Sequence, residues 1–180
     1  MATSIKEEIS SIEIPETVTI KKENNVVIVK GKLGTVTKDL TKMTAMVDLE
    51  DNKIVIKPYG KRKKDLAINN TIKSIIESMI AGVDKGFTYK LKIVYAHFPI
   101  SVKTKGKDVY VENYFGERSA RMSRIIGDDT RVNIVGEDVI VQGPNLEHVS
   151  QTAANIERST KLKYKDQRVF LDGVYVYSKE

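Results

Sequence analysis

The stretch VDLEDNKIVI at residues 47–56 is matched by VNIVGEDVIV at residues 132–141, at a constant offset of 85 positions. Each stretch alternates apolar and polar side chains on both sides of a polar turn, which is typical of a β-hairpin. A second match lies upstream, where Ile14-Pro15 precedes Phe98-Pro99 by 84 positions. Two nearly equal offsets in separate segments indicate that the chain is a tandem repeat.

Each copy also contains further turns and one helix. Turns are predicted around residues 23–25 and 51–52 in the first copy, and around Gly106-Lys107 and Gly136-Glu137 in the second. Apolar residues recur at helical spacing in two segments: Ile68, Ile72, Ile75, Ile76 and Met79, stopping near Gly82, and then Leu146, Val149, Ala153 and Ile156, after Gly143-Pro144. Alternating strands are predicted after the helices, over 87–95 and 174–177.

This order of elements predicts an α+β fold made of two tandem copies of a small antiparallel-sheet domain, each covered by one helix. We place the N-terminal copy at residues 1–96, and we expect its short acidic tail, residues 1–13, to be a loose segment or an edge strand. The C-terminal copy takes residues 97–180.

The composition limits what the protein can do. Thirty Lys and Arg against 24 Asp and Glu give a formal charge of +6, which favours an anionic partner. The chain has no cysteine, so thiol catalysis, disulfides and Cys-based zinc sites are excluded. The longest aliphatic run, residues 26–29, is far too short to span a bilayer, and the first residues do not resemble an export signal. The sequence predicts a soluble intracellular protein.

Catalytic residues are not evident. The two histidines, His97 and His148, fall in non-equivalent parts of the two copies, and a packed or turn role is predicted for His97. Asp128-Asp129 is interpreted as a solvated loop rather than a divalent-ion site. We therefore expect no enzyme activity, no metal and no cofactor. An enzyme would need a pocket that joins Asp128, Asp129 and Glu137.

Positive charge gathers in three places. Two are weaker candidates for RNA contact: the run Lys61, Arg62, Lys63 and Lys64, predicted as the loop before the first helix, and the trio Arg118, Arg121 and Arg124, which would share one side if helical. The third is the strongest: Arg158, Lys161, Lys163, Lys165 and Arg168, with Tyr164 interleaved and Gln151 and Asn155 nearby. An extended Lys-x-Lys-x-Lys segment would direct its cations to one side, toward RNA phosphates.

The same region carries a sequence signature. RVFLDGVYV at residues 168–176, preceded by QTAANI at 151–156, resembles the archaeal and eukaryotic type of the large-ribosomal-subunit protein six family, number nine in eukaryotic naming. Ile14-Pro15, Val29-Lys30-Gly31-x-x-Gly34 and the segment from Ala81 to Phe87 agree with that family too. The resemblance spans nearly the whole chain.

The resemblance implies a structural protein of the cytoplasmic large ribosomal subunit that binds large-subunit ribosomal RNA, with the C-terminal copy, residues 97–180, as the main RNA-binding domain. It further implies a position near the sarcin-ricin loop and the stalk base, beside neighbouring ribosomal proteins and close to the translational GTPases. Its implied RNA contacts are Gln151, Asn155, Lys163, Lys165, Asp166 and Arg168, with Asp172-Gly173 as the turn that directs the segment; Phe170, Val174 and Val176 are expected in the core. The alternative is a free-standing RNA-binding or ribosome-assembly factor.

Overall fold

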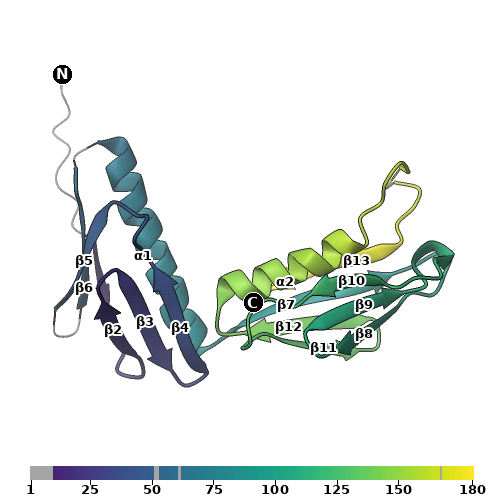
Figure 1. Ribbon diagram of the computed structural model, residues 1–180, viewed down its shortest axis with the longest axis horizontal. Coiled ribbons are helices and arrows are strands. Elements are labelled where there is room, and N and C mark those ends of the chain that lie inside the picture. Colours follow the sequence, from purple (N-terminus) through teal and green to yellow (C-terminus); the bar gives the residue numbers. More distant parts are fainter. Residues whose placement is uncertain (1–9, 51–52, 61, 167) are drawn as a thin grey trace. The chain divides into compact units, whose positions relative to one another are not determined.

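The computed structural model describes residues 10–50, 53–60, 62–166 and 168–180 (Figure 1). It divides into two compact units, Met1–Lys85 and Gly86–Glu180. Within the described residues, neither helix is both long and apolar enough to cross a membrane.

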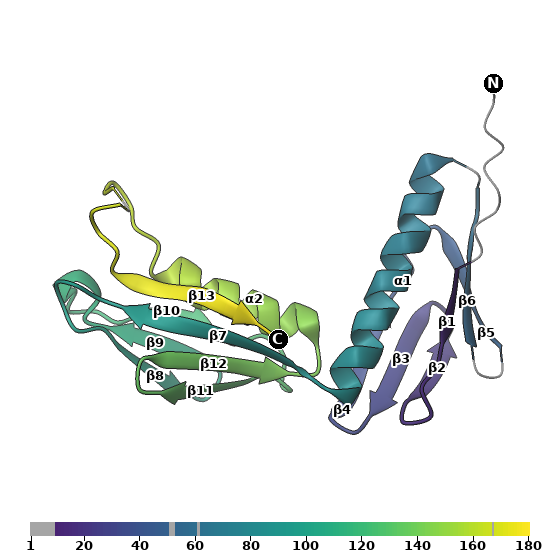
Figure 2. The same cartoon turned by 180° about the vertical axis from the view of Figure 1, so that it is seen from behind.

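The first unit has two three-stranded antiparallel sheets and one helix. The sheet orders are β1-β6-β5 and β2-β3-β4. The elements are β1 (Ser10–Glu13), β2 (Thr19–Glu23), β3 (Val26–Gly31), β4 (Gly34–Asp39), β5 (Ala45–Glu50), β6 (Lys53–Pro58) and α1 (Lys63–Asp84). Both sheets contribute side chains to a single core with α1. Figure 2 shows α1 running alongside the strands of this unit.

The second unit has a three-stranded sheet, β10-β9-β8, and a four-stranded sheet, β11-β12-β7-β13, again antiparallel. Its helix α2 packs against strands of both sheets. The elements are β7 (Phe87–Val94), β8 (Ser101–Lys105), β9 (Asp108–Glu112), a 3-10 turn (Tyr114–Gly116), β10 (Arg121–Arg124), β11 (Arg131–Val135), β12 (Asp138–Gly143), α2 (Leu146–Ser159) and β13 (Gly173–Lys179).

The predicted α+β class and the tandem arrangement are confirmed. On α1 the residues Ile72, Ile76 and Met79 are buried, while Ile68 and Ile75 are partly buried against the same core. On α2 the residues Val149, Ala153 and Ile156 are buried. Gly106 and Gly136, with φ of 63° and 61°, form the predicted turns of the second unit. Residues 51–52, which we expected to form a turn, lie outside the described residues.

The division between the units differs from the expected boundary after residue 96. It falls after Lys85, because β7 joins the sheet of the second unit, where it pairs with β12 and β13. The repeat explains why. β1 precedes Ile14-Pro15 and pairs with β6, just as β7 precedes Phe98-Pro99 and pairs with β12. Each copy therefore begins with the strand before its proline, and 87–94 is the first strand of the second copy.

Candidate nucleic-acid interface

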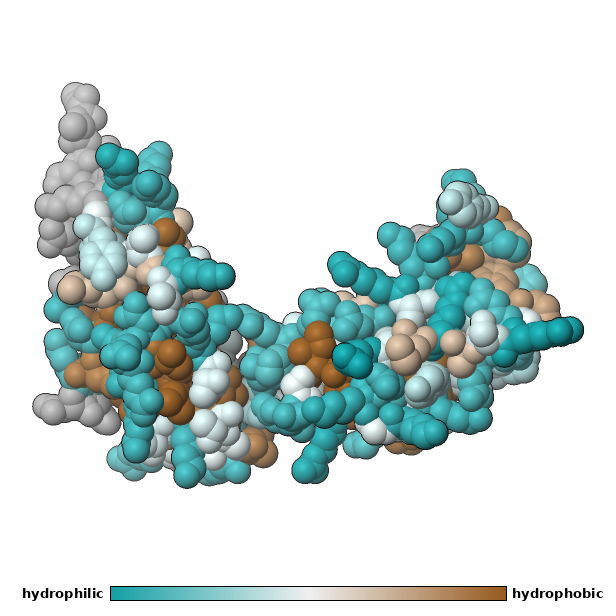
Figure 3. All heavy atoms as spheres, viewed as in Figure 1, coloured by the Kyte–Doolittle hydropathy of each residue, from teal (hydrophilic) through white to brown (hydrophobic). Residues whose placement is uncertain are grey.

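The segment that joins α2 to β13 forms a loop that projects from the second unit (Figure 1). We call residues 161–172 the basic loop; its described residues contain neither helix nor strand. Lys161, Lys163, Lys165 and Arg168 are exposed along it, and Tyr164 is fully exposed, with a relative accessibility of 104%. Figure 3 shows hydrophilic and hydrophobic residues side by side over this region.

The N-terminal end of the basic loop is anchored at the end of α2. The Tyr114 hydroxyl donates a hydrogen bond to the carbonyl of Thr160 at 2.6 Å, and the Val174 N–H donates to the Thr160 hydroxyl at 3.0 Å. Arg121 donates to the carbonyl of Ser159 at 2.9 Å. The bonds from Tyr114 and Arg121 satisfy two carbonyls that the end of a helix leaves without partners inside the helix.

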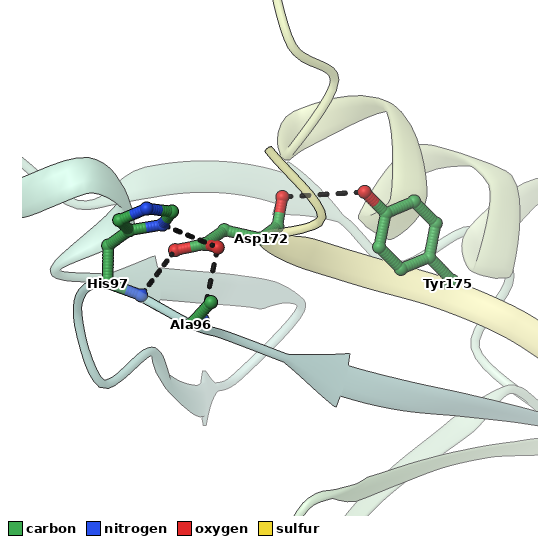
Figure 4. Close-up of polar contacts among 4 residues, drawn as sticks. All are labelled: Ala96, His97, Asp172 and Tyr175. Atoms are coloured by element: carbon green, nitrogen blue, oxygen red, sulfur yellow. Dashed lines mark hydrogen bonds and ion pairs between the residues drawn. The ribbon is translucent and has the colours of Figure 1, made fainter. Parts of the chain in front are cut away.

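The C-terminal end is anchored by Asp172, whose side chain is completely buried (Figure 4). Its carboxylate accepts hydrogen bonds from the backbone N–H of Ala96 at 3.0 Å and of His97 at 3.3 Å, and the His97 ring lies 3.2 Å away. The hydroxyl of Tyr175 donates to the Asp172 carbonyl at 3.4 Å. Burial disfavours the charged form of the carboxyl, but the hydrogen bonds from Ala96 and His97 outweigh burial, so the pKa of Asp172 is lowered.

Between its ends the loop is folded on itself around Asp166. The Asp166 carbonyl accepts from the N–H groups of Val169 at 3.1 Å and Phe170 at 3.0 Å, and its carboxylate pairs with the Arg168 guanidinium at 2.8 Å. This hydrogen-bonded pairing lowers the pKa of Asp166. Asp166, implied above as an RNA contact, therefore shapes the loop, although Arg168 keeps 90% of its side chain exposed.

Phe170 links the loop to the body of the second unit. Its ring lies 5.5 Å from the His97 ring and 6.0 Å from the Phe115 ring, and the Lys165 ammonium lies 4.5 Å above it. Phe170 is only half-buried, so the expectation of a core position is wrong for this residue. It packs at the base of a projecting loop, where solvent reaches one side. Val174 is fully buried, and Val176 packs at the edge of the core.

The lysines of the basic loop do not follow the expected regular alternation. Tyr164 has φ of 60°, in the left-handed region, which interrupts an extended segment. Lys165 consequently lies over the aromatic rings of Phe115 and Phe170. Within the described part of the chain, Lys161, Lys163 and Lys165 have no carboxylate within ion-pair distance. Their charges are available to an anionic ligand.

The exposed side of α2 continues this surface. Gln151 is exposed and donates to the side-chain oxygen of Asn155 at 2.9 Å, and Asn155 donates to the backbone carbonyl of Arg124 at 3.2 Å. Arg158 is exposed on the last turn. Gly173, whose φ of 159° is close to extended, starts β13 directly after the loop. The structure thus brings the strongest candidates of the second unit into one continuous stretch of α2, loop and β13.

The arginine trio is not helical. Arg121 and Arg124 stand at the two ends of β10, and three positions along a strand reverse the direction of the side chain. The Arg121 guanidinium is occupied: it pairs with Glu117 at 2.6 and 2.8 Å and lies 4.1 Å from the Tyr114 ring centroid. Arg124 is 77% exposed and 3.8 Å from Asp108, and Arg118 is exposed. The idea of a shared arginine face is therefore wrong.

The basic run of the first unit is only partly a loop. Arg62 is the N-cap of α1, and Lys63 and Lys64 form its first turn rather than a preceding loop. The Asp65 carboxylate accepts from the Arg62 N–H at 3.2 Å. Lys61 lies outside the described residues. The three described cations are exposed, and their contact with RNA stays a prediction.

Sequence reasoning missed the roles of Tyr114 and Arg121 as anchors of the basic loop, and it placed Asp172 only in a turn that directs the loop. Asp172 offered a signal, because an acidic residue within the apolar run 169–176 must find donors when it is buried. The donors come from Ala96 and His97, more than 70 positions away, and no sequence pattern indicates that pairing.

The fold and this site define a class: a repeated α+β domain that presents basic side chains on an anchored loop, as proteins that bind nucleic acid do. The chain belongs to the ribosomal protein L6 family, whose model matches residues 14–86 and 98–173, once in each unit. This confirms the resemblance drawn from residues 151–176.

Three similar archaeal proteins are named large ribosomal subunit protein uL6. The one from Methanosphaera stadtmanae is 48% identical over 168 residues, covering 93% of this chain and 91% of the relative. That from Staphylothermus marinus is 45% identical over 169 residues, covering 92% and 91%. That from Methanobrevibacter smithii is 43% identical over 180 residues, covering 100% and 99%.

Proposed function

We propose that this chain is a structural, non-catalytic component of the cytoplasmic large ribosomal subunit that binds large-subunit ribosomal RNA through the second unit. Its position is near the sarcin-ricin loop and the stalk base, where it supports the docking region of the translational GTPases beside neighbouring ribosomal proteins. The names of its relatives support the subunit assignment.

The observation that carries the proposal is the basic loop itself. Four cations project from an anchored scaffold, and the lysines among them have no ion-pair partner within the described residues. Cations that meet phosphates release counterions, which supplies affinity without turnover. A loop fixed at both ends recognises one RNA fold by its backbone, because the spacing of its charges is set before binding.

The first test is to sediment a native extract of the source cells on a sucrose gradient and detect the protein across the fractions, before and after a high-salt wash. Comigration with the large subunit after the wash is expected. A protein that is released at the top of the gradient would support the alternative, a free-standing RNA-binding or ribosome-assembly factor.

The second test asks which surface binds RNA. Changing Lys163, Lys165 and Arg168 together to Ala should weaken binding to protein-free large-subunit ribosomal RNA and lower the slope of log K against log salt by about 2 to 3. The matched control changes Lys103, Lys105 and Lys107 to Ala. It removes the same charge from the β8–β9 hairpin, where two of the three lysines already pair with Glu112 and Asp128. An unchanged slope in the loop variant, or equal losses in both, would show that the RNA surface lies elsewhere.

A further inference from the structure

We propose that Arg121 and Asp172 are positioning residues: they fix the two ends of the basic loop and so control RNA affinity without touching RNA. The inference rests on the proposed function in naming RNA as the ligand. It removes Arg121 from the candidate RNA contacts, and it assigns Asp172 to hold the C-terminal end of the basic loop.

Arg121 has three of its five N–H donors committed inside the protein. Two nitrogens of its guanidinium bond to the Glu117 carboxylate and a third donates to Ser159, while its carbon lies over the ring of Tyr114. Tyr114 is 1% exposed and itself bonds to Thr160, the next carbonyl of the same helix end. Arg121 and Tyr114 therefore hold adjacent carbonyls where α2 stops and the loop begins. A guanidinium that uses three of its five donors in this way, with its face over a ring, has only two donors left for a phosphate.

Asp172 does the corresponding work at the other end. A buried carboxylate has to be compensated, and here the compensating donors are two consecutive backbone N–H groups and the His97 ring. These residues follow β7 directly, so Asp172 ties the loop to the end of a central strand (Figure 4). His97 is also in contact with the Phe170 ring, so one residue supports both the end of the loop and its aromatic base.

Holding both ends matters because the loop carries long, mobile cations. Ordering each such side chain on binding costs about 0.5 to 1.5 kcal/mol, and a loop that is already shaped avoids part of that cost. The expected result of releasing either end is a loss of affinity of about tenfold. The number of phosphates neutralised, and hence the salt slope, should not change.

The deciding experiment uses acidic residues, because positioning and simple electrostatics predict opposite signs. Asp172→Asn and Glu117→Gln each remove a negative charge from a basic protein, so electrostatics alone would tighten binding to protein-free large-subunit ribosomal RNA. Positioning predicts weaker binding with an unchanged salt slope. The control, Asp128→Asn, removes the same charge from an exposed residue outside the loop and should bind as well as the wild type or better.

Arg121→Lys is a further test variant. It keeps the positive charge but removes the guanidinium that bonds to both Glu117 and Ser159. We expect the same loss of about tenfold, again with the slope unchanged. Arg121→Ala should keep that slope too. A decrease of about 1 in the slope for Arg121→Ala would identify Arg121 as a phosphate contact and overturn its positioning role.

Hydrogen exchange on the free protein separates a released loop from an unfolded unit. In Asp172→Asn, protection should fall at the amides of Ala96, His97, Val169 and Phe170, and remain at Val139 and Val141 in β12. Unchanged protection at the first four amides, or RNA binding by Asp172→Asn equal to that of Asp128→Asn, overturns the proposal for Asp172. Failure of the wild-type protein to bind the RNA would instead refute the proposed function. Hydrogen exchange would still show whether Asp172 holds the end of the loop, because it is measured on the free protein.

Discussion

At the scale of single residues, the structure is decided by how buried polar groups are satisfied. The side chain of Asp172 is completely buried, and hydrogen bonds from the Ala96 and His97 N–H groups and the His97 ring compensate for the lost water, so its pKa is lowered. Thr160, 3% exposed, is bonded both through its carbonyl and its hydroxyl. These two residues bound the basic loop, so these polar contacts lie at both ends of the segment that we propose binds RNA.

The lowered pKa of Asp172 predicts how the stability of the protein depends on pH. Its pKa is lower in the folded protein than in the unfolded chain, so its contribution to stability is present above the ordinary Asp pKa and is lost as the pH falls through the lowered value. The free energy of unfolding of the wild type should exceed that of Asp172→Asn at about pH 7, and the difference should shrink below about pH 4. Urea denaturation across this range measures it. If the difference in free energy of unfolding between the wild type and Asp172→Asn stayed constant down to about pH 3, the Asp172 carboxyl would not be stabilised in its charged form by folding.

At the scale of elements, close approach of backbone decides where glycine is needed. Gly31 ends β3 beneath α1, and a Cβ atom there would lie 2.7 Å from the Val83 side chain and 2.8 Å from the Val83 carbonyl. The Val83 carbonyl already accepts from the N–H of Leu33 and cannot move freely. The helix therefore sits against the β3–β4 turn only because residue 31 has no side chain.

We expect Gly31→Ala to destabilise the first unit by about 2 to 3 kcal/mol, because overpacking forces the end of α1 away from β3. Lys30→Ala, one residue earlier on an exposed position of the same strand, should change stability by less than about 0.5 kcal/mol. Urea unfolding followed through the amide signals of α1 would compare the two. Equal effects would mean that the contact with Val83 yields without cost.

At the scale of the whole molecule, β7 decides where one unit ends and the next begins. Leu91 and Ile93 are 0% and 5% exposed within the core of the second unit, and β7 lies between β12 and β13 in its four-stranded sheet. A fragment that lacks β7 loses the hydrogen-bonding partner of two strands at once.

The fragment 86–180 should therefore fold and unfold in one cooperative transition, whereas 97–180, the domain expected from the sequence, should not. Circular dichroism during thermal unfolding distinguishes them. A cooperative transition of similar midpoint in both fragments would show that β7 is dispensable and that the boundary after Lys85 is not a folding boundary.

The amino-acid sequence by itself determined the repeat, the α+β class, the two helix faces and the family. Each of these is written in local order: alternation along strands, spacing of Ile68 to Met79 and Leu146 to Ile156, and the contiguous signature at 168–176. It also located the basic loop, since charge density along the chain needs no partner to be seen.

Tertiary structure alone decided the rest. Residues 87–95 alternate as a strand in either copy, and only pairing with β12 and β13 assigns them to the second. Arg121 looks like any other arginine of its cluster until Glu117, Ser159 and the Tyr114 ring surround it. Asp172 finds its donors after β7, far away in the sequence. Pairings across such distances depend on how the whole chain closes, and periodicity along a segment carries no record of them.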